Sequence, residues 1–272
     1  MEKYSVLMSL YFKEKPEYLK SAIDSMLNQT LLPDEIIIVK DGKLTKELND
    51  VLDYYKRTHG KIFKIIGYDK NKGLGLALNY GLNHCSNDLV ARMDTDDISK
   101  PERCMVQVER FLADTDLAIV GSSVDEFCGD VTNIVSRRVV PSEYADIYEF
   151  AKRRSAFNHP AVMYRKSKVL EFGGYSDLRR NQDVDLFGRM LFGGCKAINI
   201  NKSLLWFRSD EGLLHRRKSW ENTWSYVATI KRFWQMGYST LLDLILVSVA
   251  QVTMYCIPVG LQNWIYKKFL RK

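Results

Sequence analysis

The chain has 272 residues, with 46% hydrophobic and 27% charged residues and a formal net charge of +7. This composition is typical of a soluble globular protein and excludes a disordered chain, a collagen and a polytopic membrane protein. The basic excess favours an anionic partner, such as nucleic acid, anionic lipid or a phosphorylated small molecule. Five cysteines without a C-x-x-C pair argue against a disulfide framework or zinc ribbon and favour a reducing compartment.

Apolar runs alternate with segments of helical spacing through the first half of the chain. We predict strands at Tyr4–Ser9, Glu35–Lys40, Ile62–Tyr68, Leu89–Met93 and Leu117–Phe127. We predict helices between them, at Pro16–Gln29, Leu44–Arg57, Leu76–His84 and Glu102–Leu112. This alternation indicates βαβ units and therefore an α/β fold with a mainly parallel sheet flanked by helices.

After Pro141 the alternation breaks down. Charged stretches separate short apolar pieces at Ala161–Tyr164, Ala197–Ile200 and Leu204–Phe207. We interpret this region as an extension of the same domain that completes a binding site. We therefore expect residues 1–215 to form one domain and residues 216–272 a helical extension.

The C-terminal extension contains a strongly apolar segment, Leu241–Leu261. Its length is just sufficient to cross a bilayer by the rule of about 20 residues. It contains Asp243, however, and a charged side chain at the centre of a bilayer is energetically unfavourable. Aromatic and basic residues follow it, a pattern favoured at membrane interfaces: Trp264, Tyr266, Lys267, Lys268, Arg271 and Lys272. We favour an interfacial or re-entrant membrane anchor over a full span or a buried helix pair.

Three acidic residues, Asp94, Asp96 and Asp97, directly follow the predicted strand Leu89–Met93. In an open parallel sheet, ligands bind beyond the carboxyl ends of the strands. Carboxylates this close repel each other unless a cation lies between them, and their oxygens favour Mg²⁺ or Mn²⁺. A helix cap before Pro101 accounts for one acid and leaves two unexplained. A metal site is therefore the stronger interpretation.

Two further segments suit a nucleotide ligand. Asp41 ends a predicted strand and can accept hydrogen bonds from a ribose hydroxyl or a base N–H, although turn aspartates are common there. The segment Asn71–Ala77 combines glycines, which let the backbone approach a ligand, with the positive charge of Lys72. It lacks the third glycine of a dinucleotide fingerprint, so alone it is weak evidence.

Two other residues have both a structural and a catalytic interpretation. His159 lies in a polar, basic stretch, where either a structural or a functional role is possible. Asp183 lies at the predicted start of a helix, where the helix dipole favours its ionised form. It can serve there as a helix cap or as a rigidly held general base.

Six motifs occur in one order along the chain: SVLMSLY, SMLNQTLLPDEIIIVKDG, NKGLGLALNYGL, ARMDTDDISKPER, FNHPAVMYRKSKVLEFGGY and NQDVDLFGR. With these motifs the chain resembles a family 2 glycosyltransferase of the GT-A fold over roughly residues 3–210. More narrowly, it is similar to bacterial exopolysaccharide and O-antigen enzymes of the amylovoran-transferase type. The resemblance implies an inverting, metal-dependent transferase that uses a nucleotide-diphosphate sugar, usually UDP-linked.

The resemblance also implies roles for individual residues. Ser9, Tyr11 and Asp41 would hold the uridine. Asp94 and Asp96 would match the DxD motif for metal and ribose, with Asp97 beside it, and Asp183 would match the catalytic base. Lys72, Arg165 or Arg208 would assist at the diphosphate, and His159 is a further candidate on the acceptor side.

One position departs from the family pattern. Many members carry Glu-Asp where this chain has Gln182-Asp183. The base is retained, and only a secondary role of the Glu, such as acceptor binding, is in doubt.

The resemblance further implies an acceptor and a location. Bacterial relatives commonly build repeat units on an undecaprenyl-diphosphate carrier at the cytoplasmic face of the inner membrane. We therefore expect transfer of galactose or glucose, β1,3, to lipid-diphosphate-linked GlcNAc by an enzyme bound peripherally to the anionic membrane surface. The basic C-terminal tail fits that surface independently.

Four alternatives remain. The enzyme could add a later sugar of a capsule or exopolysaccharide. A sugar nucleotidyltransferase would carry a Gly-rich loop near its first strand, whereas Tyr11–Lys15 has no glycine. A nucleic-acid-binding module is disfavoured because the basic clusters are dispersed and no known motif accompanies them. Retention of Asp94, Asp96 and Asp183 argues against an inactive scaffold.

Overall fold

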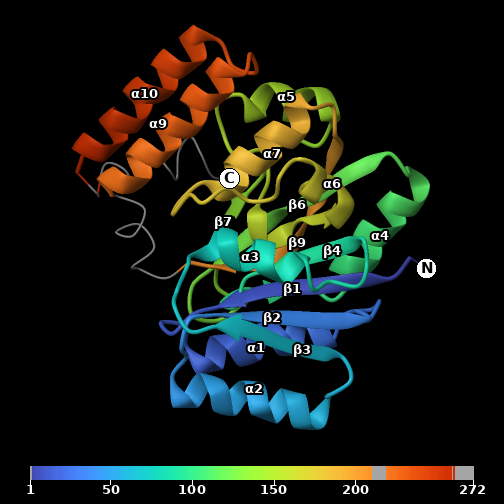
Figure 1. Ribbon diagram of the computed structural model, residues 1–272. Helices are drawn as coiled ribbons and strands as arrows, with labels where there is room; N and C mark the ends of the chain where they lie inside the picture. Colours follow the sequence, from blue (N-terminus) through green and yellow to red (C-terminus); the bar gives the residue numbers. More distant parts are fainter. Residues whose placement is uncertain (1, 210–218, 259, 261–272) are drawn as a thin grey trace.

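The computed structural model describes residues 2–209, 219–258 and 260 (Figure 1). In these residues nine strands form one sheet of order β3-β2-β1-β4-β8-β6-β9-β5, with β7 paired to β6. The strands are β1 (Tyr4–Leu10), β2 (Glu35–Asp41), β3 (Phe63–Tyr68), β4 (Leu89–Met93), β5 (Ile98–Ser99), β6 (Leu117–Phe127), β7 (Ile134–Arg138), β8 (Met163–Arg165) and β9 (Lys196–Arg208).

Helices cover both faces of the sheet (Figure 1). Their bounds are α1 (Pro16–Leu27), α2 (Lys46–Thr58), α3 (Leu74–Leu82), α4 (Arg103–Ala113), α5 (Tyr144–Ala151), α6 (Lys166–Glu171), α7 (Gln182–Phe192), α9 (Trp220–Gln235) and α10 (Leu241–Cys256), with a 3₁₀ turn η1 (His159–Ala161). Helices α1, α2 and α4 contribute to one apolar core, and α3, α5, α7 and α9 contribute to the other.

The strands β3, β2, β1 and β4 are parallel, as the βαβ alternation predicts. Met8 of β1 lies opposite Ile38 on one side and Met93 on the other. Strands β1, β2 and β4 are buried on both faces, which explains their continuous apolar runs. Because the strands end at the same edge, the residues that follow β1, β2 and β4 gather there.

The second half of the sheet contains both parallel and antiparallel pairs. The predicted α/β fold is confirmed, and the antiparallel strands are an addition to the expected parallel sheet. Every antiparallel pair among the described strands involves β5, β7 or β8. The predicted piece Ala161–Tyr164 divides between η1 and β8, which inserts between β4 and β6. The pieces Ala197–Ile200 and Leu204–Phe207 join in β9, a single strand parallel to β6 with irregular register.

The C-terminal helices α9 and α10 form a hairpin at the edge of the molecule, beyond α5 and α7 (Figure 1). Ile230 and Phe233 of α9 belong to the same apolar core as α7. Gly188 of α7 allows this approach, because a Cβ there would overlap the Phe233 ring. The described part of the extension therefore shares the core of the main domain. The expected boundary at 215 and 216 lies outside the described residues.

Among the described residues, no helix has both the length and the apolarity needed to cross a membrane. Helix α10 ends at Cys256, before the end of the expected apolar segment Leu241–Leu261. Asp243 is buried at the start of α10, where it forms a capping box with Thr240 and an ion pair with Arg153. The aromatic and basic residues predicted to anchor the tail lie outside the described residues.

Candidate active site

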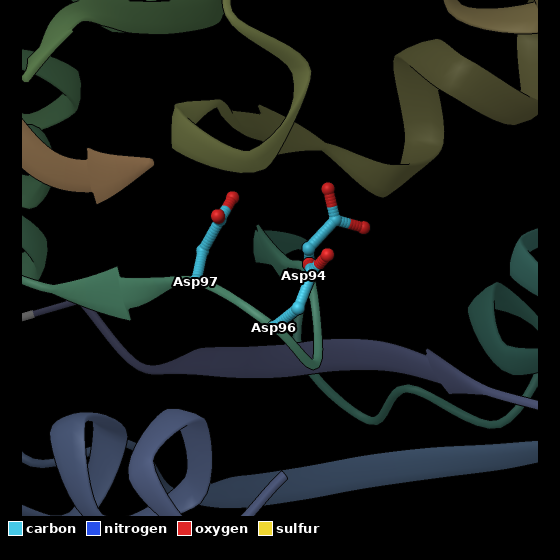
Figure 2. A group of neighbouring side chains, drawn as sticks. All are labelled: Asp94, Asp96 and Asp97. Atoms are coloured by element: carbon cyan, nitrogen blue, oxygen red, sulfur yellow. The ribbon is translucent and has the colours of Figure 1, made fainter. Parts of the chain in front are cut away.

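Asp94, Asp96 and Asp97 lie in the loop between β4 and β5, and their carboxylates project to the same side of it (Figure 2). One oxygen of each carboxylate lies within 4.8 Å of the other two. The buried strand β4 fixes one end of this loop. The pairing of Ile98 with Trp206 of β9 fixes the other end. The sheet thus holds the acidic cluster in place from both sides.

The electrostatics of this cluster fit a cation. Burial, followed by the charges of Asp94 and Glu14, raises the pKa of Asp96 to about 7. Burial and then Asp96 and Asp94 raise the pKa of Asp97 well above its usual range, although the backbone N–H of Arg208 donates to its Oδ1 over 2.8 Å. A bound cation would relieve this repulsion, and an all-oxygen donor set suits Mg²⁺ or Mn²⁺.

Arg208 is the predicted basic residue that the fold brings to the acidic cluster. Its Nε donates to the main-chain oxygen of Asp96 over 2.8 Å. Its guanidinium lies 3.9 Å from the centroid of the Tyr18 ring and 4.6 Å from that of Phe127. These contacts fix a positive charge beside the carboxylates.

Arg92 is a site residue that the sequence analysis did not identify. Its side chain is buried in β4 and forms an ion pair with Asp94. Burial lowers the pKa of His159 and the charge of Arg92 adds to this effect, whereas the same charge opposes the rise that burial causes in the pKa of Asp183. The available sequence evidence was a single arginine within an otherwise apolar strand, where an unpaired charge is costly.

Asp41 organises the loop that leads into α3. Its Oδ1 accepts from the backbone N–H of Lys72 over 2.7 Å. Its Oδ2 accepts from Asn71 Nδ2 over 2.8 Å and from the backbone N–H of Gly73 over 3.0 Å. Gly73 has φ +96°, a conformation that favours glycine. Direct contact between Asp41 and a nucleotide stays a prediction.

Asp183 lies half-buried in the first turn of α7. Burial raises its pKa, while the backbone N–H of Val184 and the charge of Arg92 oppose the rise. The preceding Asn181 adopts a left-handed conformation with φ 60°, which turns the chain sharply into the helix. The predicted position at a helix start is confirmed, and its role as a base stays a prediction.

The start of α3 packs directly against the start of α7. A Cβ on Gly75 would lie 2.8 Å from the main-chain oxygen of Ser176 and 3.3 Å from Gln182 Cγ. The Asp41 loop, α3 and the first turn of α7 therefore form one continuous wall of the candidate site.

Buried polar atoms without a hydrogen-bond partner concentrate around this wall and the acidic cluster. Among the described residues they include Arg92 Nε and Nη1, Asp97 Oδ2, Ser176 Oγ, Asn181 Nδ2 and Gln182 Oε1. Because buried polar groups in folded proteins are normally paired, this concentration marks a site that a polar ligand completes.

Ser9 and Tyr11 lie at the same edge of the sheet. Ser9 pairs with Val39 near the end of β1, and Tyr11 follows that strand with an exposed ring. The fold thus brings Ser9, Tyr11, Asp41 and the acidic cluster to neighbouring strand ends. Lys72 joins them, with its Nζ 4.7 Å from the centroid of the Tyr68 ring.

The expectation for His159 requires a correction. It lies not in a polar, basic loop but in the buried turn η1, with Nε2 2.9 Å from the Tyr175 hydroxyl oxygen. Its ring packs against Phe187. Burial, and then the charge of Arg92, lower its pKa well below the usual range. It is thus a buried residue that packs in the core, and a contact with the acceptor stays a prediction.

Arg165 also lies elsewhere than expected. It pairs with Leu89 at the amino end of β4, opposite the end that carries Asp94. Its Nη1 lies 3.0 Å from a carboxylate oxygen of Glu2, and its Nε donates to the main-chain oxygen of Leu117. Arg165 therefore stabilises the end of the sheet opposite the acidic cluster and does not belong to this site.

Residues 5–178 match the family described as glycosyl transferase family 2. The chain belongs to this family. The transferase is 35% identical to the Escherichia coli UDP-Gal:alpha-D-GlcNAc-diphosphoundecaprenol beta-1,3-galactosyltransferase, over 99% of this chain and 97% of that protein. It is 36% identical to the amylovoran biosynthesis glycosyltransferase AmsE of Erwinia amylovora, over 80% of each chain.

Solved structures show the same fold. The transferase matches residues 1–349 of S. aureus TarS in complex with UDP-GlcNAc with a TM-score of 0.65 and 14% identity, over 98% of this chain and 71% of that one. It matches the mannosyltransferase PcManGT of Pyrobaculum calidifontis, in complex with GDP-Man and Mn²⁺, with a TM-score of 0.64 and 14% identity, over 96% and 78%. The GT-A prediction and the family 2 resemblance are both confirmed.

Proposed function

We propose that the transferase moves galactose or glucose from a UDP-sugar to GlcNAc linked to undecaprenyl diphosphate, forming a β1,3 bond. The observation that carries this proposal is the 35% identity to the Escherichia coli galactosyltransferase over nearly the whole of both chains. A product of this kind is an early intermediate of a bacterial surface polysaccharide, such as an O-antigen.

The donor would bind at the common edge of the parallel strands. Ser9, Tyr11 and Asp41 would hold the uridine there, with the backbone of the loop at Lys72 beside it. Asp94, Asp96 and Asp97 would hold Mn²⁺ or Mg²⁺. When bound, such a cation stabilises the negative charge of the diphosphate as a Lewis acid. The mutual proximity of the three carboxylates supports this assignment.

Asp183 would act as the general base. It accepts the proton of the acceptor hydroxyl as that oxygen forms a bond to the anomeric carbon. The bond from this carbon to the UDP oxygen breaks on the opposite face, so the configuration inverts. Burial raises the pKa of Asp183 and makes it a stronger base, while the backbone N–H of Val184 and the positive charge of Arg92 oppose this rise.

A lipid-linked acceptor requires the enzyme to work at a membrane surface. We propose that it binds peripherally to the anionic cytoplasmic face of the bacterial inner membrane. The net charge of +7 supports this location, since each basic residue near an anionic leaflet contributes about 1 kcal/mol.

The test is a reaction of the purified protein with Mn²⁺, a synthetic GlcNAc-diphosphate-lipid and a panel of UDP-sugars. Mass spectrometry and linkage-specific glycosidases identify the product. We expect one hexose added β1,3 from UDP-galactose or UDP-glucose. No product from either donor would refute the proposed reaction. UDP release with a longer oligosaccharide acceptor would instead support the alternative expected from the sequence, a later step of capsule or exopolysaccharide synthesis.

A further inference from the structure

One side of α10 is a continuous apolar surface in this structure. Leu242, Ile245, Leu246, Val249 and Val252 are all exposed large hydrophobic residues. They follow helical spacing and form one stripe. The opposite side of the helix carries the buried Asp243 and Val247, which face the protein. We call the five exposed residues the docking face.

Aromatic side chains extend the docking face at one end of the hairpin. The rings of Trp220 and Trp224 of α9 stack with centroids 6.4 Å apart. The Tyr255 ring of α10 meets Trp220 edge-on at 5.4 Å. All three rings are partly exposed. Such amphipathic rings are enriched where protein meets the headgroup region of a bilayer.

The net positive charge of the chain comes from the same part of the sequence. Residues 216–272 contain nine Lys and Arg against two Asp and Glu, and one of the two acids is the buried, paired Asp243. This difference accounts for the whole net charge of +7, so residues 1–215 are neutral overall. An apolar helix face within a basic, acid-poor region complements an anionic lipid surface.

We propose that the α9–α10 hairpin lies flat on an anionic lipid bilayer, with the docking face and the aromatic cluster inserted at the level of the headgroups. This assignment deepens the proposed function, because it names the surface by which the enzyme reaches a lipid-linked acceptor. It is the interfacial form of the membrane anchor expected from the sequence, and it extends that anchor from one segment to a pair of helices.

The hairpin is joined directly to the candidate catalytic helix. Ser225 of α9 donates its hydroxyl to the main-chain oxygen of Arg180 over 2.8 Å, three residues before Asp183. Arg232 of α9 pairs with Asp185 of α7 over 2.6 Å. The aromatic half of α9 thus contacts the chain just before Asp183, and the other half contacts α7 just after it. Docking would therefore hold the start of α7 close to the headgroups, where the diphosphate of the acceptor lies.

The test measures sedimentation of the full-length protein with vesicles that contain neither UDP-sugar nor acceptor. We compare phosphatidylcholine vesicles with vesicles that also contain phosphatidylglycerol. The wild type should bind the anionic vesicles, and added salt should weaken this binding. The double variant Leu242→Glu/Val249→Glu should bind at least about tenfold more weakly, because two apolar side chains that would insert into the bilayer become charged.

A matched control replaces two leucines of similar exposure outside the hairpin. Leu242 and Val249 are 60% and 61% exposed, and Leu32 and Leu112 are 60% and 50% exposed. The control variant Leu32→Glu/Leu112→Glu should bind vesicles like the wild type. Both double variants should keep wild-type circular dichroism and turnover with a water-soluble, short-chain GlcNAc-diphosphate acceptor.

Three results would overturn the inference. They are a wild type that does not bind anionic vesicles, equal binding of the wild type and the hairpin variant, and a self-association of the wild type that the hairpin variant abolishes while vesicles have no effect. The last would identify the docking face as a contact between two copies. Vesicle binding is measured without the reaction, so its outcome is independent of whether the proposed transfer occurs.

Discussion

Arg232 of α9 and Asp185 of α7 form an ion pair of 2.6 Å at the junction of the hairpin and the main domain. Asp185 is fully buried and also pairs with Arg189 over 3.0 Å. Asp183, the candidate base, lies two residues before it on the same helix. One buried carboxylate thus fixes the helix of the candidate base to the element that we propose to contact the membrane.

Asp185→Asn should lower the free energy of unfolding by about 3 kcal/mol, because it leaves two arginines beside an uncharged buried group. Arg232→Gln should cost no more than about 1 kcal/mol, since the Arg232 side chain is 48% exposed and water can replace it. Urea denaturation measures both variants. Equal decreases in the free energy of unfolding would contradict the view that the buried Asp185 carboxylate contributes more than the exposed Arg232.

Asp183→Asn should retain UDP-sugar binding and lose turnover by about 10²–10⁴-fold, the usual contribution of a general base. Calorimetry measures the binding, and release of UDP in the presence of acceptor measures the turnover. Asp177→Asn, at an exposed position just before α7, serves as the control and should react normally. Near-wild-type turnover of Asp183→Asn would mean that another group removes the proton.

Asp96→Asn should weaken UDP binding in the presence of Mn²⁺ by about tenfold, because the acidic cluster loses one charged ligand. Binding without metal should change little. Asp116→Asn, at an exposed site beyond α4, provides a control for the loss of one negative charge. Titration calorimetry with and without Mn²⁺ distinguishes these cases. An equal change with and without metal would contradict the assignment of Asp96 as a metal ligand.

His159 should make the protein less stable in mild acid. Its pKa in the folded protein lies well below 6.5, so only the unfolded chain takes up a proton there. Its contribution to stability is complete above about pH 6.5 and is lost as the pH falls toward the folded pKa. The slope is up to about 1.4 kcal/mol per pH unit.

The measurement for His159 compares wild type with His159→Gln in urea denaturation between pH 7 and pH 5, about the range in which an ordinary histidine titrates. The variant should lose the hydrogen bond with Tyr175 at every pH and show the smaller decline toward pH 5. If the free energy of unfolding changes with pH in the same way in the two proteins, groups other than His159 cause the loss of stability in acid.

The sequence by itself determined the parallel half of the sheet and the places of its acidic residues. The apolar runs of β1, β2 and β4 and the helices between them follow from local periodicity, and this pattern places Asp41 and Asp94 after strands. Asp183 at a helix start has the same origin. These features depend on residues close together in the chain, so spacing alone is sufficient to predict them.

Only the tertiary structure decided which of these groups meet. Arg92 becomes a site residue because its side chain is buried and forms an ion pair with Asp94 of the acidic cluster. Arg165 is excluded because the antiparallel pairing of β8 places it at the far end of β4. The apolar segment of α10 keeps only one side exposed, since Asp243 is buried against Arg153. Each outcome depends on contacts between residues far apart in the chain, and spacing along the sequence does not specify such contacts.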